Sequence, residues 1–156
     1  MHYSKRIADF SDYSRVVSLI NDGKRQVQIT GITQWDENYP NKQLILQDIE
    51  QKKLWLYGEQ YEACVTLAEK ESIALIQRLV VHSQHQRSGI AHFILTDILQ
   101  KEKNKKEIME VRLSTNHSNL PMQKLLTSLK FVPSRKYLIP GREKFGNFIE
   151  FIYPMR

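Results

Sequence analysis

An apolar segment at residues 79–81 passes through a polar turn directly into an amphipathic helix, and a strand-like segment follows that helix. Ile90, Ile94 and Ile98 recur at helical spacing, and residues 109–113 alternate as a strand does. A strand–helix–strand crossover within one sheet is usually parallel and right-handed. The chain is therefore expected to contain a sheet with a parallel pair of strands.

Closely spaced strand-like segments precede the crossover. They cover residues 54–57, 63–67 and 73–81, and turn residues separate them at Gly58–Gln60 and Lys70–Glu71. Strands joined by such short turns pair as antiparallel hairpins. Hairpins on one side of a parallel crossover predict a mixed, mostly antiparallel, twisted sheet.

Periodicity and cap residues predict the remaining elements. The expected elements are a weak strand at residues 3–8, a helix from Ser11 or Ser14 to about Asp22, a loop at 30–40, a helix capped by Asn41, a helix capped by Asn119 with Pro121 in its first turn, and strands at 131–139 and 148–153. This order describes an α+β fold, in which a central sheet of about six to seven strands is flanked by about four helices. The chain has 156 residues, and we expect residues 1–156 to form a single domain.

Hydropathy argues against a membrane protein or an exported one. Apolar runs such as Leu79–Val81 are short, whereas a membrane helix needs about twenty consecutive apolar residues. No apolar signal core follows the first residues, Met1–Arg6. We therefore expect a cytoplasmic protein without a membrane partner.

Cysteine and histidine usage argues against a disulfide and a metal site. Cys64 is the single cysteine, so neither an intramolecular disulfide nor a zinc cluster built on cysteines can form. The five histidines include no His-Glu-x-x-His pair of the zinc-hydrolase type. Cys64 is interpreted as a small core residue, and no metal is expected.

Positive charge exceeds negative charge, with 23 Lys and Arg against 17 Asp and Glu, so the net charge is 23 − 17 = +6. The densest basic run, Lys101–Lys106, falls at the expected C-terminal end of a helix, where cations are favoured by the helix dipole. No helix-turn-helix or zinc-finger pattern accompanies it. No specific nucleic-acid partner is expected, although a basic nucleic-acid-binding domain remains an alternative that rests on charge alone.

The polar turn at residues 82–89 has the features of an anion site. An apolar strand ends, small residues follow, and a helix begins at once, which points backbone N–H groups outward at a helix N-terminus. Gly89 lets a phosphate approach the backbone without a Cβ in the way, and Arg87 adds a positive charge. A phosphate group is the natural ligand for such a turn.

The segment Gln86–Ala91 resembles the Q/R-x-x-G-x-G/A pyrophosphate loop of the GNAT superfamily of acyl-CoA-dependent N-acetyltransferases. Gly31–Trp35 with Tyr39–Pro40 is similar to the N-terminal part of many small bacterial members, and the resemblance covers nearly the whole chain. It implies a GNAT-like fold and an N-acetyltransferase that transfers an acetyl group from acetyl-CoA, its co-substrate, to a primary amine of a small molecule, peptide or protein. A monomer or homodimer is expected.

Carried over residue by residue, the resemblance implies a role for the backbone and for two asparagines. N–H groups from Arg87 through Ala91 would hold the pyrophosphate, and the Leu79 N–H would face the acetyl oxygen. Val81 would pair with the pantetheine amides. The cofactor-binding residues so implied are Leu79, Val80, Val81, Gln86, Arg87, Ser88, Gly89, Ile90, Ala91, Asn116 and Asn119.

The catalytic side chains depart from the family pattern. The frequent general-acid tyrosine corresponds to Leu126, and the acidic residue that some members carry corresponds to Leu75. No general acid or base is therefore assigned, and the sequence names no acceptor amine and no acyl chain length. These departures motivate an alternative to the N-acetyltransferase, a catalytically weak GNAT-like domain that binds acyl-CoA or a nucleotide as a sensor.

Several other polar and aromatic residues fall on elements that border the expected site. A structural or surface role is the preferred interpretation for Tyr57, His117 and Tyr137. Trp35 and Tyr39 either contact the acceptor or anchor the core.

Overall fold

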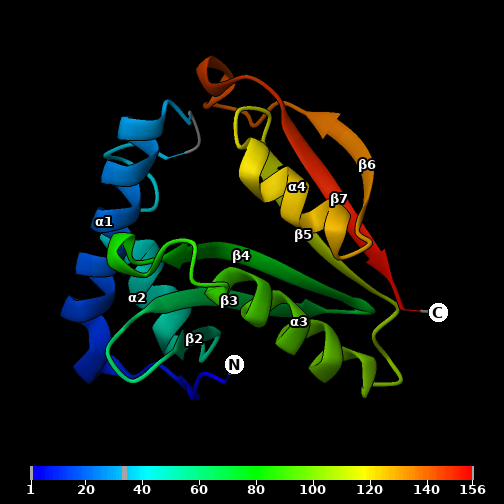
Figure 1. The fold of residues 1–156 in the computed structure, drawn as a ribbon, viewed down its shortest axis with the longest axis horizontal. Helices are drawn as coiled ribbons and strands as arrows, with labels where there is room; N and C mark the ends of the chain where they lie inside the picture. The colour runs from blue at the N-terminus through cyan, green and yellow to red at the C-terminus, as the bar shows by residue number, and fades with distance from the viewer. Residues whose placement is uncertain (1, 33–34, 156) are drawn as a thin grey trace.

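The computed structural model describes residues 2–32 and 35–155 (Figure 1). Its elements follow the predicted order. They are β1 Lys5–Ile7, η1 Phe10–Asp12, α1 Tyr13–Thr30, α2 Lys42–Glu50, β2 Leu54–Tyr57, β3 Ala63–Lys70, β4 Ile73–Val81, η2 Ser83–His85, α3 Ile90–Lys103, β5 Glu110–Asn116, α4 Leu120–Ser128, β6 Val132–Tyr137, η3 Glu143–Phe145 and β7 Phe148–Pro154.

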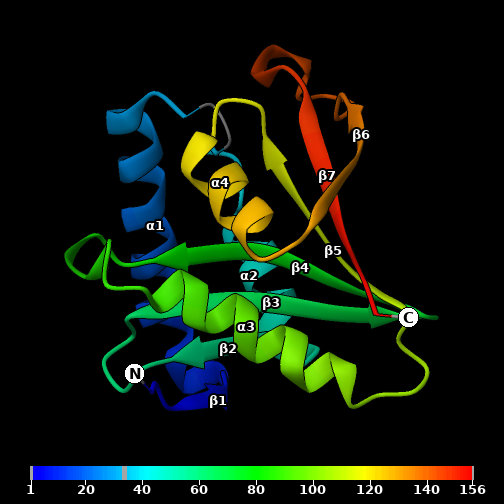
Figure 2. The same cartoon turned by 45° about the vertical axis from the view of Figure 1, so that its right-hand side comes forward.

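The strands form one mixed sheet of 7 strands in the order β1-β2-β3-β4-β5-β7-β6. β4 and β5 are parallel, and all the other neighbouring pairs are antiparallel. Figure 2 shows β1 to β4 as one half of the sheet, and β5, β7 and β6 fanning away from it as the other. The expected α+β fold with a mostly antiparallel sheet is confirmed.

Helices cover both faces of the sheet, and each face has its own apolar core. On the face of α3 and α4, Ile94 and Leu126 pack with Val65 and Leu113 of the strands. On the opposite face, α1 and α2 pack against β2 to β4, and Cys64 belongs to this second core. These two faces are called the α3/α4 face and the α1/α2 face below.

Helix α1 is longer than its sequence pattern predicts. The helical spacing of apolar residues predicts an end near Asp22, but α1 continues to Thr30 and ends at Gly31, whose φ is 77°. A Cβ added at Gly23 would lie 2.5 Å from Cγ2 of Val80. Gly23 therefore permits close approach of α1 to β4 and does not terminate the helix.

The predicted caps are confirmed. The Asn41 side chain accepts a hydrogen bond from the Leu44 N–H at 2.8 Å, and the Asn119 side chain accepts one from the Met122 N–H at 3.3 Å. The predicted loop is confirmed for residues 32 and 35–40, while residues 33 and 34 lie outside the described ranges. Within those ranges, no helix has both the length and the apolar character needed to span a bilayer.

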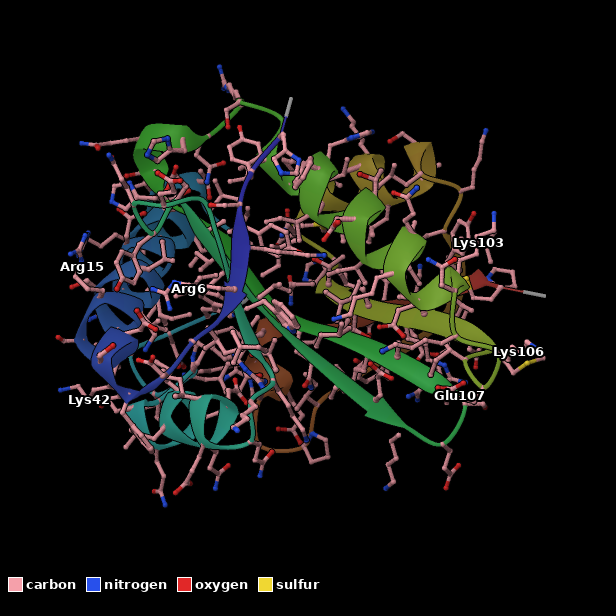
Figure 3. The ribbon with its side chains drawn as sticks, turned by 90° about the horizontal axis from the view of Figure 1, so that it is seen from below. Arg6, Arg15, Lys42, Lys103, Lys106 and Glu107 are labelled. Carbon is pink, nitrogen blue, oxygen red and sulfur yellow. The ribbon has the colours of Figure 1, made fainter. Side chains whose placement is uncertain are left out.

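The basic run at residues 101–106 ends α3, as the sequence predicts. Lys101 and Lys103 lie in the last turn of the helix. Figure 3 shows Lys103, Lys106 and Glu107 pointing outward at this end of the molecule, far from Arg15 and Lys42 at the opposite end. The basic side chains labelled at these two ends therefore do not lie in one patch.

Candidate functional site

The two parallel strands separate along their length. β4 and β5 pair at four positions, from Ile73 with Glu110 to Ile76 with Leu113, although both strands continue beyond that point. Figure 1 shows the two strands diverging toward the loops that follow them. Among the described residues, 77–81 of β4 have no paired partner on β5, so backbone groups at this edge can bind a ligand. The Val81 carbonyl is an exception, because it accepts hydrogen bonds from Gln26 at 3.0 Å and from Gln86 at 2.8 Å.

A β-bulge lies in β4 at the beginning of this split. Thr66 of β3 pairs with Gln77, and Cys64 pairs with Val80, so two residues of β4 lie opposite one of β3. The bulged residue Arg78 has a φ of 51°, a left-handed value that is unusual for a residue with a side chain. The bulge alters the direction of β4 immediately before Leu79, the residue expected to donate its N–H to an acetyl oxygen.

The turn between β4 and α3 presents its backbone to the same region. Arg87 has a φ of 63°, and Gly89, the residue before α3, has a φ of 84°. Gly89 has no side chain to cap the helix, so the first N–H groups of α3 remain for a ligand, close to the positive end of the helix dipole. The predicted strand–turn–helix geometry at residues 86–91 is present.

Helix α1 holds this turn in place through two side chains. The Asp22 carboxylate accepts hydrogen bonds from the Ser83 N–H at 2.8 Å and from the Ser83 hydroxyl at 2.9 Å. Burial opposes the charge of Asp22, but these hydrogen bonds and one from Gln26 outweigh it and lower its pKa. Gln26 also accepts a hydrogen bond from the Gln86 side chain at 2.7 Å. The conformation of the turn thus depends on residues about sixty positions earlier in the chain.

The two asparagines expected to contact a ligand already have partners in the protein. The Asn116 amide is fully buried, donates to the Phe145 carbonyl at 3.0 Å and accepts from the Ser118 N–H at 3.0 Å. Asn119 caps α4. Both side chains therefore shape the end of β5 and the start of α4, and their contact with a ligand stays a prediction.

A cavity of about 350 Å³ opens over the α1/α2 face, beside the split. It is lined from strands β4 to β7 and from the segments 35–40 and 138–147, which bring together parts of the chain about a hundred residues apart. The lining residues are Trp35, Tyr39, Leu75, Ile76, Gln77, Arg78, Ser114, Arg135, Tyr137, Ile139, Arg142, Phe148 and Glu150. It is called the β5–β7 cavity below.

Two charged groups of the β5–β7 cavity were missed by the sequence analysis. Glu150 is buried on β7, and Arg142 stacks on the rings of Tyr39 at 4.4 Å and Phe145 at 4.6 Å. One signal was present, since Glu150 interrupts an otherwise apolar strand, Phe148–Tyr153. Its cavity could not be foreseen, because the walls are distant in sequence.

Comparison with known proteins decides the family. The family model described as an acetyltransferase (GNAT) domain matches residues 23–123, more than half of the chain. The chain belongs to the GNAT acetyltransferase family. The predicted resemblance is confirmed, and no curated protein sequence matches the chain.

Solved GNAT structures share the fold over the full chain. A GNAT-family acetyltransferase from Streptococcus agalactiae is 18% identical, with a TM-score of 0.82 over 97% of this chain and 95% of that one. The PaiA N-acetyltransferase from Thermoplasma acidophilum, solved in complex with coenzyme A, is 15% identical, with a TM-score of 0.80 over 99% of each chain. The protein yncA from Salmonella typhimurium, solved with its cofactor acetyl-CoA, is 13% identical, with a TM-score of 0.74 over 100% of this chain and 95% of that one.

This GNAT chain places apolar residues at both positions where catalytic side chains were sought. Leu126, on α4, is completely buried in the α3/α4 core. Leu75 lines the β5–β7 cavity without offering a titratable group. Neither position therefore supplies a general acid or base.

The other candidate residues take largely structural roles. The Tyr57 hydroxyl donates to Asp97 on α3 at 2.7 Å, and burial together with this hydrogen bond raises the Tyr57 pKa. The His117 ring packs on Gly146, where an added Cβ would lie 2.6 Å from Nε2. Cys64 is buried as predicted, and burial raises the pKa of its thiol to about 12. Among the described residues, no three His, Cys, Asp or Glu side chains gather as metal ligands would.

Trp35, Tyr39 and Tyr137 all line the β5–β7 cavity. Trp35 is also a buried member of the α1/α2 core, so the two interpretations offered for it are compatible.

Proposed function

We propose that this GNAT protein transfers an acetyl group from acetyl-CoA to a primary amine. The observation that carries the proposal is the split between β4 and β5, where pairing stops after Ile76 and Leu113 although both strands continue. An extended thioester arm can occupy the split and hydrogen-bond to the strand edges, as an added strand does. The acetyl-CoA and coenzyme A held by yncA and PaiA support this ligand.

The turn before α3 fits the anionic part of acetyl-CoA. Its N–H groups from Arg87 through Ala91, together with the uncapped start of α3, would bind the pyrophosphate. The left-handed conformation at Gly89 exposes the backbone without a Cβ. Gln86, Ser88 and Ile90 would contribute to the same loop.

The chemistry requires an oxyanion donor, a deprotonated amine and a leaving thiolate. The Leu79 N–H, next to the bulge at Arg78, is proposed as the donor to the acetyl oxygen. Val80 and Val81 would line the pantetheine arm, with Asn116 and Asn119 at its far side. A thiol with a pKa near 8.5, as in cysteine, leaves as its anion without a dedicated acid at roughly neutral pH.

The β5–β7 cavity is proposed as the acceptor site. It adjoins β4 at Gln77 and Arg78, next to the predicted position of the acetyl group. A volume of about 350 Å³ lies at the lower end of the range for small-molecule sites. A sensor has no need of a second cavity beside the acyl group, so the cavity favours an enzyme.

Calorimetric titration with acetyl-CoA at physiological salt, with ATP as the anionic control, tests the cofactor. Selective binding of acetyl-CoA is expected, and free-thiol release with a panel of primary amines then tests turnover. Equal weak binding of both ligands, or no binding, would overturn the proposal. Tight binding of acetyl-CoA without transfer to any amine would support the sensor.

A further inference from the structure

Glu150 is the carboxylate of the β5–β7 cavity. It lies on β7 directly opposite Ser114 of β5, and both residues line the cavity. Glu150 is 8% exposed. Of the described residues that line the cavity, Glu150 is the only one with a carboxylate side chain.

The contacts of Glu150 leave its oxygens accessible to a further donor. Oε1 lies 3.4 Å from Nε of Arg135, and Oε2 lies 3.8 Å from Nη1 of Arg112. Both distances exceed the 2.7–3.2 Å of a strong N–H···O hydrogen bond. Arg112 has a closer partner in Glu110, which accepts from Nε at 3.0 Å. These two long contacts therefore do not saturate the carboxylate, which can accept a further hydrogen bond.

Arg135 is a partner that can be displaced. It lies on the edge strand β6, its side chain is 60% exposed, and its guanidinium stacks on Tyr137 at 4.6 Å. An exposed ion pair contributes only about 0–1 kcal/mol. A cation entering the cavity can replace Arg135 at Glu150 while Arg135 keeps its contact with Tyr137.

From this geometry we infer that Glu150 binds the ammonium group of the acceptor and removes its proton. The inference rests on the proposed acetyl transfer and deepens it, because it supplies the base that Leu75 and Leu126 cannot. It also defines the acceptor as an aliphatic primary amine, which arrives protonated at neutral pH and needs both a counter-ion and a base. The apolar walls at Trp35 and Phe148 suit an acceptor with an apolar body.

The protons and electrons of this reaction balance. Glu150 takes one proton from the ammonium, and the freed lone pair forms the bond between nitrogen and the acetyl carbon. The bond from that carbon to sulfur breaks, and sulfur leaves with the electron pair as the thiolate. The second proton of the nitrogen goes to that thiolate, which yields an amide and coenzyme A, and Glu150 returns its proton to solvent.

Within residues 2–32 and 35–155, no other group facing Glu150 can act as this base. The charged and titratable side chains around it are Arg112 on β5, Arg135 and Tyr137 on β6, Arg78 on β4, Tyr39 in the loop after α1 and Arg142 in the loop before β7. Guanidinium groups keep their protons near neutral pH, and a neutral phenol does not accept a proton from an ammonium. The role of general base is therefore assigned to Glu150.

The test compares the wild type with Glu150→Gln, and uses Glu110→Gln as the matched control. Both substitutions remove a carboxylate partner of Arg112, but Glu110 pairs with Pro154 at the far end of β5, outside the cavity. Free-thiol release is measured with acetyl-CoA and 2-phenylethylamine, spermidine, lysine or an alanyl dipeptide, from pH 6 to 10. Binding of acetyl-CoA is measured in parallel.

We expect Glu150→Gln to lower kcat/KM about 100-fold or more near pH 7, which is the size of a general-base contribution. The deficit should shrink toward pH 10, where a rising fraction of the amine is already deprotonated. Acetyl-CoA affinity should change less than about twofold, and Glu110→Gln should retain nearly full activity. In Glu150→Ala, added formate should restore part of the rate by placing a carboxylate in the vacated space.

The experiment distinguishes failure of the Glu150 inference from failure of the proposed function. If acetyl-CoA binds and Glu150→Gln matches Glu110→Gln, or loses activity equally at all pH values, Glu150 is not the base. The same conclusion follows if the wild type binds acetyl-CoA but acetylates none of these amines. Failure of acetyl-CoA itself to bind would overturn the proposed function instead. Thermal melts of each variant identify any loss that comes from unfolding, and formate rescue of Glu150→Ala then decides the role.

Discussion

Arg78 on β4 donates two hydrogen bonds to Asp48 on α2, from Nε to Oδ2 at 2.8 Å and from Nη2 to Oδ1 at 2.9 Å. Both side chains are less than a tenth exposed, and Thr66 donates a further hydrogen bond to Asp48 at 2.8 Å. This buried pair fastens the bulged residue of β4 to α2. It thereby fixes the backbone beside Leu79, where the oxyanion donor is proposed.

Replacing Asp48 by Asn should destabilise the protein strongly. The substitution leaves the buried Arg78 guanidinium without its counter-ion, which typically destabilises a protein by about 3–5 kcal/mol. The control is Asp97→Asn, since Asp97 pairs with Lys5 at 2.7 Å and accepts from Tyr57 but is 24% exposed. An asparagine oxygen can still accept from Tyr57, and a solvent-accessible ion pair contributes about 1 kcal/mol or less. Urea unfolding followed by circular dichroism measures both losses, and equal losses would contradict the importance of the buried pair.

Replacing Gly23 by Ala should destabilise the protein, although alanine is the better helix former. The gain in helix propensity is about 1 kcal/mol, whereas overpacking typically costs about 1–3 kcal/mol. The added Cβ would lie 2.5 Å from Val80 and 3.0 Å from the Trp35 ring, so these neighbours must move. A net loss of about 1 kcal/mol in the free energy of unfolding is expected. Asn21→Ala, on an exposed part of α1, should be neutral or slightly stabilising, and a stabilised Gly23→Ala would show that α1 can shift.

Gly89→Ala should weaken acetyl-CoA binding, and Gly31→Ala should not. The two glycines have similar left-handed φ angles of 84° and 77°, so both substitutions strain the backbone by a similar amount, about 1–2 kcal/mol. Only Gly89 lies in the proposed pyrophosphate loop, where a Cβ and an altered backbone would displace the phosphate. A rise in Kd of about tenfold or more is expected for Gly89→Ala, equivalent to about 1.4 kcal/mol. Calorimetry on both variants measures it, and unchanged affinity in Gly89→Ala would argue against the loop assignment.

Glu102→Met should stabilise the protein near neutral pH. Glu102 is fully buried in α3, its Oε2 has no hydrogen-bond partner, and burial and the nearby Glu69 raise its pKa although Lys105 opposes them. Because the folded-state pKa lies above the unfolded value, the contribution of Glu102 to stability is complete below the unfolded pKa and is lost as pH rises through the folded pKa. A methionine avoids that loss, so a gain of about 1–2 kcal/mol is expected at pH 7.5.

The gain from Glu102→Met should shrink as the pH is lowered toward about 4, where the wild-type carboxyl is protonated in both states. Unfolding curves at several pH values measure this trend. The variant loses the ion pair of Lys105 with Glu102 at 3.4 Å, but Lys105 keeps its ion pair with Glu69 at 2.5 Å. A gain that stays constant with pH would show that packing, and not the charge, is responsible.

Local patterns were sufficient for most of the fold. The starts of α2 and α4 could be predicted from Asn41 and Asn119, because each cap is a hydrogen bond between residues three positions apart. The turns at Gly58 and Glu71 likewise lie within single hairpins, and both residues have positive φ. The second half of α1 was missed because its contacts, such as that of Gly23 with Val80 57 residues away, do not show in a local pattern.

For the candidate site too, features formed by neighbouring residues could be predicted and features formed by distant residues could not. The loop at residues 86–91 is contiguous, so its pattern was sufficient to place it. The β5–β7 cavity joins Tyr39 to Arg142 and Leu75 to Glu150, and neither pair can be recognised without the sheet order. The carboxylate sought at residue 75 on β4 is supplied from β7, on the other side of β5.

The short pairing of β4 with β5 also has a mechanical meaning. The sheet has two halves, one formed by β1 to β4 and the other by β5, β7 and β6. Strand pairing joins these halves through four residue pairs between β4 and β5. A molecule bound along both strand edges would hydrogen-bond to both halves and would restrict their motion relative to each other. Occupancy of the split should then be readable without any chemistry, as a higher Tm and as slower amide exchange in β4 and β5.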